Sequence, residues 1–245
     1  MIPKIIHYCW VGDKRFPVAV ERYIASWKAL LPDYDFMLWD KEGSNIDAIP
    51  WTREAFAKKK YAFVADYIRC YALYHHGGIY LDSDVEVLKS FDPFLNNKYM
   101  IGKENSGSIE AAVIGAEPRS LLFEKMLDYY NTRHFDCGNG LLDMRAVPLI
   151  LDEVIRKNFK VKQISSPSEY DKNVDTISLL TDDFFSPKSC HDGKIYLTSN
   201  TVCIHHYSQS WQSPIRKYGR KLVLKIGGPK LKDLIKSIIY GRTLE

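Results

Sequence analysis

The sequence has few cysteines, and none of them are spaced as metal-binding or redox motifs require. Its five cysteines are far apart along 245 residues and no Cys-x-x-Cys pair occurs, which excludes a zinc ribbon and a thioredoxin-type site. Cys9, Cys70 and Cys203 lie in apolar stretches, where a free buried thiol is the ordinary state. This cysteine usage favours a reducing, cytoplasmic compartment.

Long apolar runs are also missing, since no stretch approaches the ~18 apolar residues that a membrane-spanning helix needs. The first residues, Met1 to His7, do not place a basic segment before an apolar one, so we expect no signal peptide. Internal repeats and low-complexity linkers are absent from the body. With 46% hydrophobic and 26% charged residues, the composition is that of a globular chain, and the length is typical of one α/β domain.

The net charge is small as well. Its formal value is +4 at pH 7, which does not indicate a nucleic-acid partner. The distribution of charge is uneven, because residues 212–242 hold nine basic residues and one acidic residue. Residues 1–211 carry a net charge of −3. The sequence therefore predicts one folded domain over residues 1–213 and a basic tail over residues 214–245.

The tail has the pattern of an amphipathic helix. Its apolar residues recur at helical spacing and are Leu231, Leu234, Ile235, Ile238 and Ile239. Lysines flank this stripe, so the helix either packs on the domain or lies on an anionic membrane surface. The second interpretation predicts peripheral association with the inner face of the membrane.

Strands and helices are predicted to alternate along the domain. Runs of β-branched and aromatic residues predict strands at 4–10, 35–39, 79–81, 85–87, 99–102, 111–115, 161–164, 195–198 and 201–205. Helical spacing of apolar residues predicts helices at 17–31, 52–76, 118–132 and 146–157. This alternation predicts an α/β sheet with helices on both faces.

The strongest chemical signal is a pair of carboxylates, Asp82 and Asp84, directly after the short apolar strand Ile79–Leu81. Ligands of open α/β sheets bind beyond the carboxyl ends of the strands. Two aspartates there offer hard oxygen ligands to a divalent ion, which could stabilise a diphosphate leaving group. An isolated Asp-x-Asp is more often an ordinary acidic turn, and the apolar strand before it favours the metal interpretation.

Asp66 and Arg69 stand three residues apart in the preceding predicted helix, so they share one face among apolar neighbours. Such a buried-looking pair must be an internal salt bridge or must bind a ligand. Trp10 ends the first predicted strand, where it either packs in the core or stacks on a nucleobase.

A second cluster, His205-His206, follows a predicted strand, and consecutive strand residues point to opposite faces. One histidine can then face the core and the other the site. Histidine is a common metal ligand, although imidazole suits zinc better than manganese.

These segments together resemble a known family. They are Ile2–Trp10, Ala65–Arg69, Gly77–Asp84 and His205–Trp211, and in this order they resemble the sugar-nucleotide-dependent glycosyltransferases of family 32. That family includes bacterial capsular polysaccharide transferases, yeast mannosyltransferases and the glucosyltransferase domains of clostridial toxins. The resemblance covers residues 2 to about 211.

The resemblance implies a GT-A fold, which is a Rossmann-like mixed sheet with helices on both faces. It further implies a nucleotide-diphosphate sugar donor (a UDP-sugar is favoured), Mn²⁺ or Mg²⁺, and retention at the anomeric carbon. A hexose would pass to a glycan or lipid-linked saccharide acceptor, in the synthesis of capsule, exopolysaccharide or another surface glycan.

The resemblance also implies a role for each matching residue. Asp66 and Arg69 would hold the donor sugar and its phosphate, Asp82 would contact the ribose, the sugar or metal-bound water, and Asp84 would ligate the metal. The remaining donor-binding residues implied are Trp10 on the base, Tyr80 near the donor, and Ser210 and Trp211 over the diphosphate.

The third metal ligand is implied less directly. Toxin relatives place an acidic metal ligand five residues before the final tryptophan, and the same offset here falls on His206, with His205 as the alternative. The chain also departs from many relatives around Glu110 and Asn139, which leaves these two as further candidates near the sugar and acceptor.

Two other functions fit parts of the pattern. Haloacid-dehalogenase-type phosphatases also carry Asp-x-Asp after a buried strand, as Asp82 and Asp84 do, but there the motif follows the first strand. A sugar-nucleotide-binding module with a degenerate site would bind a donor without turning it over. The joint presence of Asp82, Asp84 and Arg69 favours the transferase.

Overall fold

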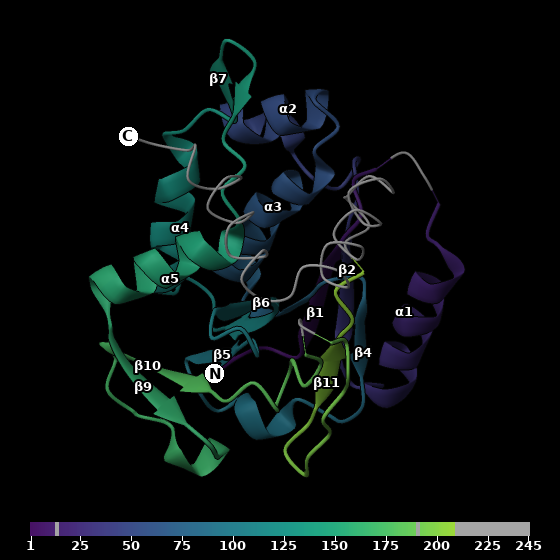
Figure 1. Ribbon diagram of the computed structural model, residues 1–245, viewed down its shortest axis with the longest axis vertical. Coiled ribbons are helices and arrows are strands. Elements are labelled where there is room, and N and C mark those ends of the chain that lie inside the picture. The colour runs from purple at the N-terminus through teal and green to yellow at the C-terminus, as the bar shows by residue number, and fades with distance from the viewer. Residues whose placement is uncertain (13–14, 190–191, 209–245) are drawn as a thin grey trace. The chain divides into compact units, whose positions relative to one another are not determined.

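A seven-stranded mixed sheet forms the centre of the computed structural model, which describes residues 1–12, 15–189 and 192–208 (Figure 1). The strand order is β2-β1-β3-β6-β5-β10-β9. The strands are β1 (Ile5–Cys9), β2 (Asp35–Trp39), β3 (Gly78–Leu81), β5 (Tyr99–Lys103), β6 (Ile109–Ala116), β9 (Lys160–Ile164) and β10 (Thr176–Leu180). Only β6 runs antiparallel to its neighbours in this sheet. The other six strands therefore end at one edge, to which β6 contributes its first residues.

Helices cover both faces of the sheet, as the alternation of elements predicts (Figure 1). The helices are α1 (Val18–Leu30), α2 (Pro50–Ala57), α3 (Tyr61–His76), α4 (Leu121–Asn131) and α5 (Val147–Asn158). Helices α2 to α5 bury their apolar residues in one core cluster, and α1 places Trp27 in the other. None of the helices in the described part of the chain has the length and apolarity needed to cross a lipid bilayer.

Strand β3 shows how the alternation of side chains divides the two cores. Ile79 and Leu81 belong to the cluster on the α1 side, whereas Tyr80 belongs to the cluster on the α3 side. Gly77, directly before this strand, and Gly78, its first residue, are needed for close packing. A Cβ atom on Gly77 would lie 2.7 Å from Pro118 Cδ, and one on Gly78 would lie 2.6 Å from the Ile5 carbonyl oxygen.

Two short ribbons accompany the main sheet. Strands β4 (Val85–Val87) and β11 (Cys203–His205) pair antiparallel with each other, which confirms the predicted strand at 85–87 and the last three residues of the strand predicted at 201–205. Strands β7 (Asp136–Gly138) and β8 (Leu141–Leu142) form a hairpin near α2 (Figure 1). Met1–Tyr207 is one compact unit, and the tail predicted over residues 214–245 lies outside the described residues.

Two secondary-structure predictions are wrong, and strands β7, β8 and β10 are missing from the predicted set. The helix predicted at 52–76 is broken into α2 and α3, because Lys59 adopts a φ of 56° and the chain folds back. This reversal places the Trp51 indole N–H on the Phe63 carbonyl, 3.1 Å away. The strand predicted at 195–198 is an exposed segment with a single bridge, Lys188 to Ile195. Strand β10 was not predicted, since Ser178 and acidic neighbours interrupt its apolar pattern.

His7, in the middle of β1, is fully buried and is held as a neutral ring. Its Nε2 donates to the Gly77 carbonyl at 2.7 Å, and its Nδ1 accepts from the Trp39 indole N–H at 3.1 Å. Burial therefore lowers the pKa of His7 to about 4. Because a second ring proton would point at the Trp39 N–H, protonation must disrupt this contact.

We expect His7 to make stability fall with acidification. The unfolded chain binds more protons than the folded chain between the two pKa values, so the stabilisation is complete above pH ~6.5 and is lost progressively towards pH ~4. The loss amounts to about 3 kcal/mol. Urea unfolding at pH 7 and pH 4.5 should show a smaller difference for His7→Gln than for the wild type. An unchanged pH dependence in His7→Gln would contradict this account.

Candidate active site

The aspartate pair lies in a tight turn at the carboxyl end of β3. The Asp82 N–H donates to the Ala112 carbonyl at 2.8 Å, and the Val85 N–H closes the turn on the Asp82 carbonyl at 3.0 Å. Val85 then opens strand β4, and its partner in β11 is His205. The ribbon register thus brings a histidine that is about 120 residues away in sequence to the aspartate turn.

Asp82, Asp84 and His205 form a group that could hold a metal ion. One ligand atom from each of these half-buried residues lies within 4.8 Å of the other two. His205 Nε2 is 3.7 Å from Asp84 Oδ1. Two carboxylates and an imidazole are donors that Mn²⁺ and similar ions accept, so these residues fit a divalent cation.

A buried carboxylate, Glu110, orients the histidine from behind. Glu110 is 0% exposed, and its Oε2 lies 3.2 Å from His205 Nδ1. The same oxygen accepts from Ser186 Oγ at 2.5 Å, and Oε1 accepts from the Ala112 N–H at 2.7 Å. Ser186 also hydrogen-bonds the Tyr207 hydroxyl at 2.6 Å. With its Nδ1–H donated to Glu110, His205 directs Nε2 towards the aspartates, the arrangement common behind metal-ligating histidines.

The electrostatics of the pair match this geometry. Burial acts to lower the pKa of His205, but Glu110, Asp84 and Asp82 outweigh it and raise that pKa to about 9. Burial acts in the opposite sense on Glu110, yet the charge and hydrogen bond of His205 hold the pKa of this carboxyl below its ordinary value. In the ligand-free protein the two side chains therefore form an ion pair.

Arg69, in α3, links Asp82 to the backbone of β6. Its guanidinium donates from Nη2 to Asp82 Oδ1 at 3.0 Å and from Nη1 to the Ala111 carbonyl at 2.6 Å. Asp66 Oδ1 lies 3.4 Å from Nη2, and the guanidinium carbon is 4.5 Å from the Tyr80 ring centroid. Burial disfavours the charged form, but Asp82 and its neighbours keep the pKa of Arg69 above its ordinary value.

The site carries more acidic groups than basic ones. Burial raises the pKa of Asp66 to about 7 against the opposing charge of Arg69. Burial also raises the pKa of Asp82, which Arg69 opposes and Asp84 reinforces. Four carboxyl groups here face one arginine and one histidine, and a bound cation would relieve the repulsion among them.

The other predicted residues are placed as follows. His206, the histidine favoured by the sequence offset, turns away from the aspartates: its Nε2 lies 2.7 Å from Glu86 Oε2 and its ring stacks on Tyr23. The geometry therefore favours the alternative, His205. Tyr80 is 1% exposed beneath Arg69, so in this conformation it supports Arg69 and does not reach a ligand.

Trp10 is half-buried, with its ring 5.0 Å from that of Phe16, and it follows the end of β1 at the same sheet edge as Asp82. Asn139 is exposed at the tip of the β7–β8 hairpin, with a φ of 53°. Ser210 and Trp211 lie outside the described residues. Ser186 and Tyr207 were not predicted, because only the fold reveals that they support Glu110.

The mixed sheet, with its aspartate turn at the carboxyl end of β3, defines a GT-A-type α/β fold, as predicted. Residues 17–101 match the family described as "Glycosyltransferase sugar-binding region containing DXD motif". The DXD motif itself is Asp82-Ser83-Asp84, and the predicted resemblance to DXD glycosyltransferases is confirmed.

Individual relatives agree with this family. Inositol phosphoceramide mannosyltransferase 3 of Schizosaccharomyces pombe is 31% identical over 121 residues, covering 46% of this chain and 33% of the relative. Mannosyl phosphorylinositol ceramide synthase SUR1 of Saccharomyces cerevisiae is 31% identical, covering 56% of this chain and 36% of the relative. The matched segments span about a third of the length of these curated relatives.

A longer match exists at lower identity. The uncharacterized glycosyltransferase L373 of Acanthamoeba polyphaga mimivirus is 26% identical, covering 86% of this chain and 84% of the relative. Among solved structures, the PaToxG glycosyltransferase has a TM-score of 0.52 at 20% identity, covering 64% of this chain and 69% of that one. This structural likeness supports the fold.

Proposed function

We propose that this chain is a metal-dependent, retaining glycosyltransferase that moves a hexose from a nucleotide-diphosphate sugar to a glycan or lipid-linked saccharide acceptor. The observation that carries the proposal is the cluster of Asp82, Asp84 and His205 at the carboxyl end of β3, with Arg69 fixing Asp82. The relatives named as mannosyltransferases of inositol phosphoceramide support a hexose and a lipid-linked acceptor. A role in surface-glycan synthesis follows the resemblance to capsular transferases.

Each residue of the cluster has a distinct task in this proposal. Arg69 holds Asp82 Oδ1, which leaves the second carboxylate oxygen to the ligand. Asp84 and His205 supply the other two ligand atoms, and Glu110 sets the ring orientation of His205. A divalent cation bound there supplies positive charge to the diphosphate leaving group. Trp10 would stack on the donor base, and Ser210 and Trp211 would cover the diphosphate.

In this proposal the configuration at the anomeric carbon is retained because the acceptor hydroxyl attacks from the same face of the sugar ring from which the diphosphate departs. The bond between the anomeric carbon and the diphosphate oxygen breaks, and its electron pair goes to the diphosphate. The acceptor hydroxyl oxygen forms the new bond to the anomeric carbon, and its proton passes to the departing diphosphate oxygen. Catalysis of this kind rests on positioning and electrostatic stabilisation, which a rigid, charged cluster provides.

A donor screen tests the function. Sugar nucleotides with UDP and GDP are added with Mn²⁺, first in thermal unfolding and then in a hydrolysis assay. A donor present at 100 times its Kd stabilises by ~2.7 kcal/mol, which at ~2–4 °C per kcal/mol raises Tm by about 5–10 °C. EDTA should abolish both the shift and the hydrolysis, because the diphosphate then lacks its cation.

The same screen separates the alternatives. Donor affinity without hydrolysis or transfer would identify a binding module with a degenerate site. Release of phosphate from small phosphoesters, without any sugar-nucleotide binding, would identify a phosphatase. Neither alternative is favoured, since Asp82 follows the third strand of the chain and the relative inositol phosphoceramide mannosyltransferase 3 carries a transferase name. Peripheral membrane association through residues 214–245 stays a separate prediction.

A further inference from the structure

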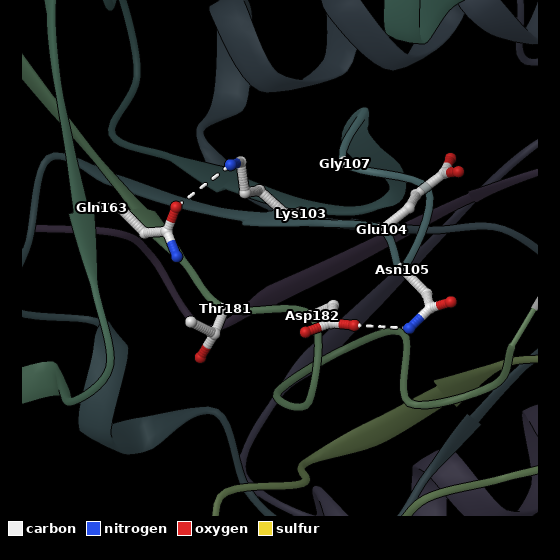
Figure 2. Close-up of a pocket in the computed structure, with 7 residues that line it drawn as sticks. All are labelled: Lys103, Glu104, Asn105, Gly107, Gln163, Thr181 and Asp182. Atoms are coloured by element: carbon white, nitrogen blue, oxygen red, sulfur yellow. Dashed lines mark hydrogen bonds between the residues drawn. The ribbon is translucent and has the colours of Figure 1, made fainter.

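A polar pocket of about 190 Å³ opens where β5, β10 and β9 end (Figure 2). Its side chains come from the end of β5 and the connection that follows it, from the end of β9, and from the residues after β10. They are Lys103, Glu104, Asn105, Gln163, Thr181 and Asp182. Because β3 ends at the same sheet edge, the pocket and the aspartate cluster face the same side of the fold.

The lining of this pocket suits a neutral compound with several hydroxyl groups. Asn105 Nδ2 donates to Asp182 Oδ2 at 2.9 Å, and Lys103 Nζ donates to Gln163 Oε1 at 3.1 Å (Figure 2). The second atoms of these amide and carboxylate groups offer donors and acceptors side by side, as vicinal hydroxyls require.

The charge of the lining argues against an anionic ligand. Lys103 contributes one positive charge, whereas Glu104 and Asp182 contribute two negative charges, so a diphosphate would be repelled. The side chains are all polar, which also excludes an acyl chain. At about 190 Å³ the pocket is smaller than the ~300–1,000 Å³ of sites for drug-sized ligands, and one sugar ring is the fitting size.

The pocket lies at a distance that a short saccharide can bridge. Strand β5 is two positions from β3 in the sheet, and β10 is three positions away. With β9 four positions from β3 and neighbouring strands ~4.8 Å apart, the pocket extends from about 10 to 19 Å from β3, the strand before Asp82. Residues 182–186 link the pocket to the aspartate cluster. The Asp182 carbonyl accepts from the Ser186 N–H at 2.9 Å, and the Ser186 hydroxyl donates to Glu110, which orients His205.

We infer that this pocket is a subsite for a neutral sugar ring of the saccharide acceptor, held by Asn105, Gln163 and Asp182. This inference rests on the proposed transferase function, and it adds the place and the chemical class of the acceptor. The acceptor hydroxyl would then reach the donor from the β5–β10 side of the aspartate cluster.

The test uses the ratio of transfer to hydrolysis, measured in one reaction with the donor found by the screen. Methyl α-D-mannopyranoside, methyl α-D-glucopyranoside and methyl β-D-galactopyranoside serve as acceptors. Asp182→Asn and Asn105→Ala should each lower the ratio about tenfold, because the first removes a charged acceptor for a sugar hydroxyl and the second removes the whole amide group. Asp128→Asn, on the exposed face of α4, should leave it unchanged. A ratio that is unaffected in both pocket variants would overturn the inference while the transferase function stands.

A second measurement does not depend on turnover. The side-chain amide signals of Asn105 and Gln163 are followed by ¹⁵N NMR while the three methyl glycosides are added to the wild-type protein. Shifts of these signals support the subsite, even if no donor is hydrolysed and the proposed function fails. If glycosides are glycosylated, yet neither amide signal moves, the acceptor binds elsewhere and the inference is wrong.

Discussion

Replacing Asp84 with asparagine is expected to lower sugar transfer about 10²–10³-fold, the usual effect of removing one stabiliser of developing charge. Asp84 offers a carboxylate oxygen within 4.8 Å of the ligand atoms of Asp82 and His205. An amide there is a weaker ligand and carries no charge. The measurement is initial rate against Mn²⁺ concentration with a saturating donor, and excess Mn²⁺ should not restore the wild-type rate.

Stability separates this effect from misfolding. The metal-free Asp84→Asn protein should unfold at about the same temperature as the wild type, because the substitution removes both the repulsion between Asp84 and Asp82 and the attraction between Asp84 and His205. The exposed Asp128→Asn variant serves as the matched control for the amide substitution and should keep full activity. Undiminished transfer by a folded Asp84→Asn protein would refute the metal role of this residue.

Glu110→Gln should weaken Mn²⁺ binding about 10–100-fold, the range found for groups that orient metal-ligating histidines. Both oxygens of Glu110 accept hydrogen bonds, Oε1 from the Ala112 N–H and Oε2 from Ser186 and His205. A glutamine can present only one oxygen. Its amide nitrogen must therefore face either the Ala112 N–H or His205 Nδ1, and the second choice places the proton on Nε2, the atom needed for the metal.

The readout for Glu110 is the Mn²⁺ concentration at half-maximal rate, compared with the maximal rate. We expect the Mn²⁺ concentration at half-maximal rate to rise in Glu110→Gln. The maximal rate should largely recover at excess Mn²⁺, whereas in Asp84→Asn it should not. Loss of buried hydrogen bonds should also lower stability by about 1–3 kcal/mol, but a purely structural defect would not be reversed by metal. Glu124→Gln, on the exposed surface of α4, should change neither quantity. Equal Mn²⁺ dependence in wild type and Glu110→Gln would contradict the positioning role.

The sequence predicts the local elements well because their signals are local. Strand β2 has the predicted bounds, and the double glycine marks the boundary as predicted, with Gly77 ending α3 and Gly78 beginning β3. The break between α2 and α3 has no comparable local signal. Its cause is the burial of Trp51 against α3 and the β7 region, a contact that forms only in the folded protein.

In the candidate site, too, the residues with a local sequence signal are predicted and those that depend on tertiary contacts are not. Asp82 and Asp84 stand out because both carboxylates follow one buried strand. The choice between His205 and His206 depends on the register of β11 against β4, and an offset taken from relatives does not contain that register. Glu110 lies 95 residues from its histidine partner, and its burial becomes visible only when β6 is placed beside β3 and β5.

Because β6 runs antiparallel to β5, the connection between them lies at the same sheet edge as the aspartate cluster but is separate from it. Residues 104–108 connect β5 to β6 on the exposed rim, and a Cβ atom on Gly107 would meet nothing within 4 Å. The pairing of Ile109 with Lys103 fixes where this connection re-enters the sheet, so Glu110 keeps its place when the connection changes. If the proposed acceptor subsite is correct, we expect exchange of residues 104–108 between related chains to change the acceptor preference while Asp82, Asp84 and His205 keep their places.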